Sequence, residues 1–316
     1  MGGLPGRLHV RLAADAASVA GVRRFVADGL DSWGDGRFAD AAELVASELT
    51  TNVALHAGAA FMYVTLERTP DGVRVSVEDD GPLGADVVQA RTPTGEDLSW
   101  SELDATGRGL AIVGMVAQSW GVGPTDRGKH VWADLADPDD DDVLAQPEPG
   151  APRAPEAPGP QELPPGWVMV RLAGCPVELS LQQDRHLDEL VRELQLLSVN
   201  HDDPESAALA HEISGLLVSP THARLTGRRT AERARDEGRD VVDIDMAMPR
   251  EFSGLVTRLH EAVARADQLS REGRLLTLAS PPEIQELRAW MTHEVSVQAM
   301  TGAAPVPWAE WRSAAG

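Results

Sequence analysis

Several residue types are scarce in this chain of 316 residues. Its only cysteine is Cys175, which excludes an internal disulfide and a cysteine-based metal site and fits a reducing cytoplasm. Lys129 is the only lysine, so nearly all basic residues are arginines. The chain has neither a signal peptide nor an apolar run of about 18 residues. We therefore expect a soluble, cytoplasmic protein without a membrane partner.

Positive charge is also in deficit. Asp and Glu number 50 against 28 Lys and Arg, which gives a formal net charge of −22. An acidic surface repels phosphate backbones, so direct nucleic-acid binding is not expected. The hydrophobic fraction of 42% suffices for real cores, and the length predicts about two domains.

A break in composition indicates where those domains meet. The segment 137–166 contains the acidic run Asp139–Asp142 and nine prolines, so it cannot build a core. We predict an N-terminal domain over residues 1–136, an acidic Pro-rich linker over 137–166 and a second domain over 167–316.

The first domain is predicted to be α+β, with a mixed sheet and helices on one face. The expected elements are strand 7–12, helix 16–33, helix 43–57, strands 61–68 and 73–79, helix 110–119, and strands 122–125 and 131–135. The interval 83–106 is predicted to be a mobile cover. The order is not an alternating βαβ pattern, and the GxxxxGK[ST] phosphate loop does not occur.

The helix 43–57 has a candidate chemical face. Glu48, Asn52 and His56 are spaced four residues apart and project from neighbouring positions. An amide oxygen suits Mg²⁺, and a carboxylate can accept a proton from a nucleophile. The simpler alternative is a solvated polar face. A separate apolar stripe is expected to pack on the sheet, and it comprises Leu44, Val45, Leu49, Val53 and Leu55.

Two further motifs follow in the chain. Asp79-Asp80-Gly81 ends a strand, where a carboxylate can accept from a ligand amine and glycine permits close approach; an ordinary turn is the alternative. Thr106-Gly107-Arg108-Gly109-Leu110 opens a predicted helix, whose free N–H groups and dipole favour an anion such as phosphate.

In this order, Glu48-Leu-Thr-Thr-Asn52, Asp79-Asp80-Gly81 and Gly107-Arg108-Gly109-Leu110 resemble the N, G1 and G2 boxes of the GHKL (Bergerat-fold) ATPases. The sequence is most similar to the bacterial anti-sigma-factor serine kinases, or switch-protein kinases. Gly128-Lys129-His130-Val131-Trp132 fits the same group. The resemblance covers about residues 7–136.

The resemblance implies ATP and Mg²⁺ as ligands. Asn52 would ligate Mg²⁺, Glu48 would be the general base, and Asp79 would accept from the adenine amino group. Gly81 would let the base approach, and the remaining positions would admit the phosphates: Gly107, Arg108 and Gly109, with Leu110 completing the box. His56 is a further candidate contact, with a structural histidine as the alternative.

Two positions depart from the family pattern. The second glycine of the G1 box falls at Leu83, and His130 takes the place of a threonine at the start of the last strand. No helical pair with a phosphoacceptor histidine precedes the ATP unit, which disfavours a two-component histidine kinase.

Three functions remain open. The first is a serine kinase that binds a sigma factor and phosphorylates a small anti-anti-sigma antagonist, with a homodimer favoured by the resemblance. The second is a non-catalytic binding module in which ATP orders the cover. The third is a degenerate scaffold.

The second half is predicted to be a mainly α bundle with regulatory or interaction roles and no catalytic constellation. Strand-like segments at 167–173 and 241–246 interrupt the helical pattern. One helix is rich in arginine, which indicates either a solvated face or a site for an acidic partner; its arginines are Arg224, Arg228, Arg229, Arg233 and Arg235.

Overall fold

The computed structural model describes residues 6–81, 105–136, 162–199, 204–218 and 221–315. Most of the predicted cover (83–106) and of the predicted linker (137–166) therefore lies outside the described residues, while residues 105–106 belong to a helix. Contacts divide the chain into two compact units, Met1–Pro165 and Gly166–Gly316. Helices and strands are both present, which confirms the α+β class.

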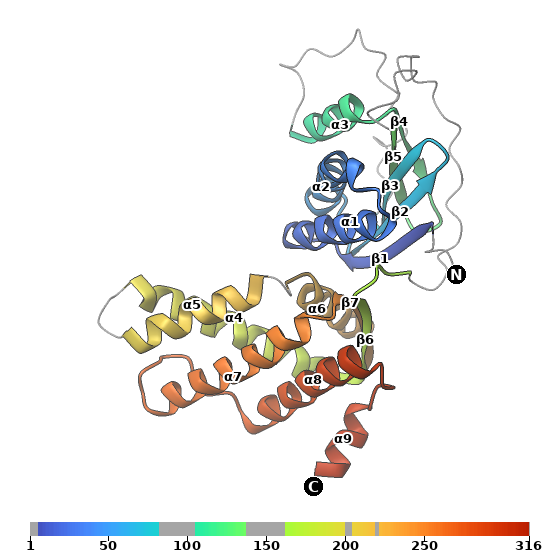
Figure 1. Ribbon diagram of the computed structural model, residues 1–316. Coiled ribbons are helices and arrows are strands. Elements are labelled where there is room, and N and C mark those ends of the chain that lie inside the picture. The colour runs from blue at the N-terminus through green and yellow to red at the C-terminus, as the bar shows by residue number, and fades with distance from the viewer. Residues whose placement is uncertain (1–5, 82–104, 137–161, 200–203, 219–220, 316) are drawn as a thin grey trace. The chain divides into compact units, whose positions relative to one another are not determined.

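The first unit is a five-stranded sheet covered on one face by helices (Figure 1). Its elements in chain order are β1 (Arg7–Ala13), η1 (Ala16–Ser18), α1 (Val19–Trp33), η2 (Gly36–Phe38), α2 (Ala39–His56), β2 (Phe61–Thr69), β3 (Gly72–Asp79), α3 (Ala105–Val116), β4 (Ser119–Pro124) and β5 (Lys129–Ala136). The strand order is β1-β2-β3-β5-β4. All four pairings between these described strands are antiparallel, so the parallel pairing implied by a mixed sheet is not seen among them.

Period-two burial in the strands and period-3.6 burial in the helices create the core of this unit. Leu8, Val10 and Leu12 of β1 face the helices, as do the alternate valines of β3. Two members of the stripe predicted on α2 are wrong, because Leu44 and Leu55 are 41% and 64% exposed. They lie outside the arc that contacts the sheet, and only Val45, Leu49 and Val53 of that stripe are buried.

The second unit places a two-stranded ribbon among helices (Figure 1). Its elements are β6 (Trp167–Pro176), α4 (Val177–Val199), α5 (Pro204–Val218), α6 (Thr221–Asp236), β7 (Val241–Pro249), α7 (Phe252–Arg271), α8 (Pro282–Thr301) and α9 (Trp308–Ala315). One apolar core surrounds the antiparallel ribbon, and another lies among α4, α5 and α7. The C-terminal segment packs on α8, where Trp290 contacts Trp308 with ring centroids 5.4 Å apart.

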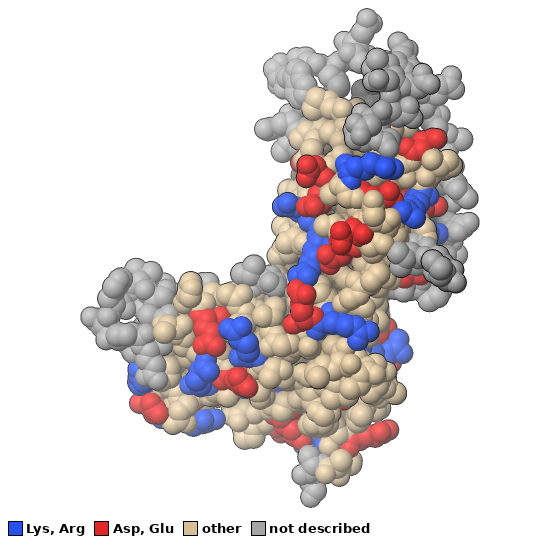
Figure 2. All heavy atoms as spheres, viewed as in Figure 1, with Lys and Arg blue, Asp and Glu red and all other residues tan. Residues whose placement is uncertain are grey.

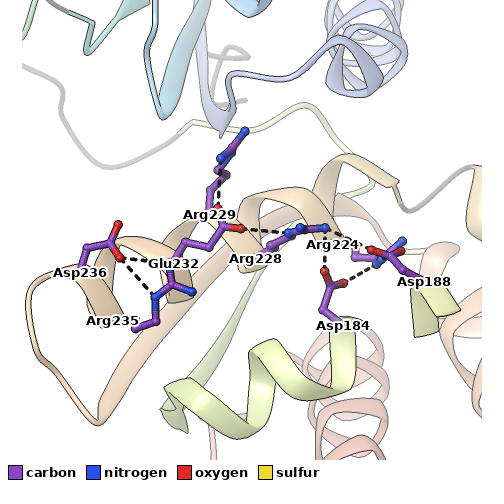
Figure 3. A network of polar contacts seen from close by, with 8 residues as sticks. All are labelled: Asp184, Asp188, Arg224, Arg228, Arg229, Glu232, Arg235 and Asp236. Atoms are coloured by element: carbon purple, nitrogen blue, oxygen red, sulfur yellow. Dashed lines mark hydrogen bonds and ion pairs between the residues drawn. The ribbon is translucent and has the colours of Figure 1, made fainter. Parts of the chain in front are cut away.

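The surface is less uniform in charge than the net value suggests. Figure 2 shows acidic and basic side chains interspersed on the visible face of both units. The arginines of α6, for which a solvated face and a site for an acidic partner were both open, are engaged locally. Arg224 and Arg228 pair with Asp184 and Asp188 of α4, and Arg229 pairs with Glu232 (Figure 3). None of the described helices is both long and apolar enough to span a membrane.

Candidate functional site

Helix α2 sets the position of the first two candidate residues. Its buried face holds it against the sheet, so the positions one third of a turn away are half-buried at the edge of the core. Glu48 and Asn52 occupy these positions one turn apart. His56 is exposed in the last turn of α2, and eight residues of helix rotate it by about 80° from Glu48. The sequence grouping therefore holds for Glu48 and Asn52, while His56 stands apart.

Glu48 and Asn52 converge on one point of α3. A Cβ atom built on Gly109 would lie 2.9 Å from Glu48 Oε2 and 3.2 Å from Asn52 Oδ1. The nearest atoms are the ends of two side chains, so a Cβ at this position would displace the Glu48 carboxylate and the Asn52 amide from where they converge. Glu48 and Asn52 of one predicted motif thus lie beside Gly109 of another, although about 60 residues separate the two motifs in the chain.

The helix that carries Gly109 begins earlier than predicted. It spans Ala105–Val116 instead of 110–119, so Gly107 lies in its first turn and Gly109 in its second. The N–H groups of the first turn have no acceptor within the helix, whereas that of Gly109 lies one turn further in. Gly109 therefore lies beside Glu48 and Asn52, and Gly107 keeps a place suited to an anion. Leu110 is half-buried, and the side chain of Arg108 lies outside the described residues.

Asp79 supplies a buried acceptor at the end of β3. It is 1% exposed, and its Oδ1 accepts a hydrogen bond of 3.0 Å from the Gly81 N–H. Its Oδ2 is buried without a hydrogen-bond partner. Lys129 Nζ lies 3.7 Å from Oδ2, close enough for an ion pair but beyond hydrogen-bond distance. Burial raises the pKa of Asp79, and the Lys129 charge opposes that rise.

The adjacent Asp80 has a structural role instead. Its Oδ1 accepts hydrogen bonds of 2.9 Å from the N–H groups of both Ala60 and Phe61. These bonds fasten the end of β3 to the start of β2. Because successive side chains of a strand point to opposite faces, Asp80 joins the two strands while Asp79 faces the helices.

Two glycines close the chain around Asp79. A Cβ on Gly81 would lie 2.2 Å from the carbonyl oxygen of Ala57, at the end of α2. A Cβ on Gly128 would lie 2.5 Å from the Asp79 carbonyl oxygen. Neither position accepts a larger residue without a backbone shift. Gly81 thus packs the G1 segment on α2, a role that the motif alone did not reveal.

Lys129 lies on the same face of the sheet as Asp79, and the sequence motifs gave this lysine no role. In the register of β3 and β5, Asp79 pairs with Lys129 and Glu78 pairs with His130. His130 therefore lies on the opposite face of the sheet, where its ring packs over Gly123. The residue that replaces the family's threonine thus faces away from Asp79. Counting alternate residues back from the buried Leu135 and Ala133 would have identified Lys129.

These residues fit a nucleotide by their chemistry. The free Oδ2 of Asp79 is an acceptor suited to an amine of a base, and Glu48 with Asn52 offers two converging oxygens suited to a hard cation. Among the described residues, no group of three or more His, Cys, Asp or Glu side chains forms a metal site. A cation here would thus depend on few protein ligands, as Mg²⁺ does when phosphate and water supply the others.

A comparison with known protein families finds a match in this unit. Residues 12–135 match the family model for the histidine kinase-like ATPase domain, which spans the end of β1 to the end of β5. The match supports the GHKL-type ATPase superfamily for this part of the chain and an ATP-binding regulatory protein. A comparison with curated proteins finds no match for the chain.

Proposed function

We propose that the N-terminal unit is an ATP-dependent serine kinase of the anti-sigma-factor type, which phosphorylates a small antagonist protein. The observation that carries this proposal is the convergence of Glu48 and Asn52 on Gly109. This arrangement combines a proton acceptor and a cation ligand at the start of a helix suited to phosphate. A sigma factor would be the second partner, and the unit at 167–316 would serve regulation or interaction. The dimer favoured by the resemblance is part of the same proposal.

ATP would bind between Asp79 and the first turns of α3. Asp79 Oδ2 would accept from the adenine amino group, Gly107 would receive phosphate, and Asn52 Oδ1 would ligate Mg²⁺. Bound Mg²⁺ would neutralise phosphate charge, and the described residues would position the reactants. Positioning and charge neutralisation account for most of the rate enhancement in phosphoryl transfer.

Glu48 would complete the reaction as general base. Its carboxylate would take the proton of a serine hydroxyl as that oxygen bonds to the terminal phosphorus and ADP departs. The carboxylate is half-buried on a rigid helix, so it needs little rearrangement to meet the hydroxyl. Adjacent Asn52 would hold the cation one turn away on the same helix.

A non-catalytic ATP-binding module is the second candidate, and the position of Lys129 favours it. Lys129 lies 3.7 Å from the oxygen assigned to adenine, and this ion pair must adjust when a base binds. The resulting protein would bind ATP, change the state of its cover and alter an interaction of the second unit without phosphate transfer.

Calorimetry and phosphotransfer assays on the full chain separate the two candidates. Glu48→Ala should retain ATP·Mg²⁺ binding and lose phosphotransfer by about 10²-fold or more. Asn52→Ala should lose most of the increase in affinity that Mg²⁺ provides. Glu43→Ala is the matched control, because Glu43 lies on the same helix in a surface ion pair with Arg23.

The phosphotransfer assay uses small candidate antagonist proteins as substrates, together with radioactive ATP. Transfer to a serine that requires Glu48 supports the kinase. Binding of ATP without transfer to any antagonist supports the module. Transfer that survives Glu48→Ala contradicts the assigned base, and absence of ATP binding contradicts both candidates.

A further inference from the structure

The second unit contains a cavity that the proposed ATP site does not use. Its volume is about 170 Å³, and it lies between the β6–β7 ribbon and helices α4, α6, α7 and α8. Apolar side chains such as Ile244, Met246 and Val263 form most of its wall. A buried apolar cavity of about 150 Å³ holds one benzene molecule, so this volume suits a ligand of one-ring size.

One side of the cavity is polar, and three of its lining residues each have a buried atom without a hydrogen-bond partner. These atoms are Gln183 Oε1, His260 Nδ1 and Arg288 Nε. The Arg288 side chain is only 10% exposed. Buried polar atoms are normally hydrogen-bonded, so a group of three around one cavity indicates that something else supplies the bonds.

The charges beside the cavity are already balanced. Arg288 Nη2 donates to Asp267 Oδ2 at 2.9 Å and to Ser280 Oγ at 3.0 Å, and its Nε is a buried donor without a hydrogen-bond partner. Arg224 and Arg228 are paired with Asp184 and Asp188 (Figure 3). Burial lowers the pKa of His260, as does the adjacent Arg288 charge, so its imidazole is neutral near pH 7. A charged ligand would upset this balance.

We propose that this cavity binds a neutral, mainly apolar small molecule of one-ring size that carries a hydrogen-bond donor beside an acceptor, as carboxamides, lactams and phenols do. The ligand acceptor would meet Arg288 Nε–H, and its donor would meet Gln183 Oε1. The second unit would then sense a small molecule. This inference rests on residues of the second unit alone and is independent of the ATP site.

Benzamide is the first probe, and it is compared with toluene and benzoate on the full-length protein. Ligand-detected NMR followed by calorimetry should give benzamide binding at least about tenfold tighter than either comparison compound, the difference that one net hydrogen bond provides. Equal binding of toluene would reduce the site to an apolar void and overturn the polar assignment. Tighter binding of benzoate would overturn the neutral class, and no binding of any probe would overturn the site.

Two variants test the location. Gly227→Leu adds a side chain on the cavity wall, where a Cβ meets Met246 Sδ at 3.5 Å and Ile244 Cγ2 at 3.6 Å, and it should reduce benzamide binding at least about tenfold. Gly254→Leu is its control, because this helical glycine has open space around its Cβ. The control should bind benzamide as the parent does, and equal loss in both would contradict the location.

Gln183→Leu keeps the proposal testable if Gly227→Leu fails to fold. It removes a buried acceptor that has no partner, so the fold should tolerate it. Benzamide binding should fall several-fold while toluene binding stays the same or improves. The neighbouring Gln182→Leu, on the exposed side of α4, should change neither. Unchanged benzamide binding in Gln183→Leu would contradict the assigned contact.

Discussion

Asp79 in the first unit and Asp267 in the second are comparable at first sight. They are 1% and 3% exposed, and each has one cation beside it: Lys129 at 3.7 Å and Arg288 at 2.9 Å. Their pKa values nevertheless move in opposite directions. Burial raises the pKa of Asp79, whereas the hydrogen bonds from Ser280, the nearby His186 imidazole and the Arg288 charge overcome the effect of burial on Asp267 and lower its pKa to about 2.

Hydrogen-bond satisfaction explains the difference. Both oxygens of Asp267 accept bonds, from Ser280 on one side and from Arg288 on the other. Asp79 has one bonded oxygen and one without a hydrogen bond. A buried carboxylate with all its bonds made joins α7 to α8 and contributes to structure. A buried carboxylate with one oxygen that accepts no hydrogen bond is less favourable in the absence of a ligand. A ligand that donates a hydrogen bond to that oxygen would stabilise it.

The largest expected effect is on the stability of the second unit. Asp267→Ala leaves Arg288 buried without its counter-charge, which should cost about 3–5 kcal/mol of unfolding free energy. Asp79→Asn should change the stability of the first unit by less than about 1 kcal/mol, because Lys129 is 20% exposed and its charge can reach water. Hydrogen exchange of amides in α7 and α8, and separately in β3 and β5, measures each unit in the full chain. Equal losses of unfolding free energy in Asp267→Ala and Asp79→Asn would contradict the structural difference between the two aspartates.

The next effect is on nucleotide affinity. Asp79→Asn removes a charged acceptor, whose bond to an amine is worth about 1.5–3 kcal/mol, so ATP affinity should fall by about 10- to 100-fold. Glu78→Gln is the matched control, because it lies next to Asp79 on the opposite face of β3. Calorimetry with ATP·Mg²⁺ measures both. Unchanged affinity in Asp79→Asn would reject the adenine assignment.

Acid should affect the two aspartates with opposite sign. The pKa of Asp267 is about 2 in the folded state against an ordinary 3.8, so its contribution of roughly 2.5 kcal/mol is present above about pH 4 and is lost as pH falls toward 2. The pKa of Asp79 is raised in the folded state, so the protein takes up a proton at this group when it folds. The contribution of Asp79 to the free energy of unfolding therefore decreases as pH rises through its folded pKa.

Denaturation of the parent, Asp267→Asn and Asp79→Asn between pH 2 and 7 checks these signs. The advantage of the parent over Asp267→Asn should shrink as pH falls. The stability of the parent relative to Asp79→Asn should decline as pH rises. A common direction for both pairs would contradict the assigned environments.

Local pattern predicted much of this molecule. Turn residues and period-two alternation located β2 and β3, and helical spacing placed Glu48 beside Asn52. These features depend on neighbours in the chain. The α+β class followed from the order of such elements, and the two strand-like segments of the second half became the ribbon β6–β7.

Features set by distant neighbours were missed. The place of Lys129 depends on the register of β3 against β5, and the position of Gly109 beside Glu48 and Asn52 depends on how α2 and α3 pack. The exposure of Leu44 and Leu55 depends on how wide a contact α2 makes with its sheet. The cavity near Arg288 is formed by segments from residue 172 to residue 295, and no single segment contains its pattern.

Lys129 provides the smallest and most discriminating change. The Lys129 charge opposes the rise in the pKa of Asp79, so Lys129→Met should raise that pKa further. Protonated Asp79 is a poorer acceptor, and ATP affinity should therefore begin to fall at a higher pH in Lys129→Met than in the parent. Near pH 7.5 the ATP affinities of Lys129→Met and the parent should differ by less than about tenfold, since an ion pair at this distance is worth about 1 kcal/mol.

Calorimetric titrations from pH 5 to 8 measure how ATP affinity depends on pH, and Lys129→Arg, which keeps the charge, should follow the parent. Identical profiles for all three would show that Lys129 does not govern the protonation of Asp79, and the contrast with Arg288 and Asp267 would then lie in hydrogen bonds alone.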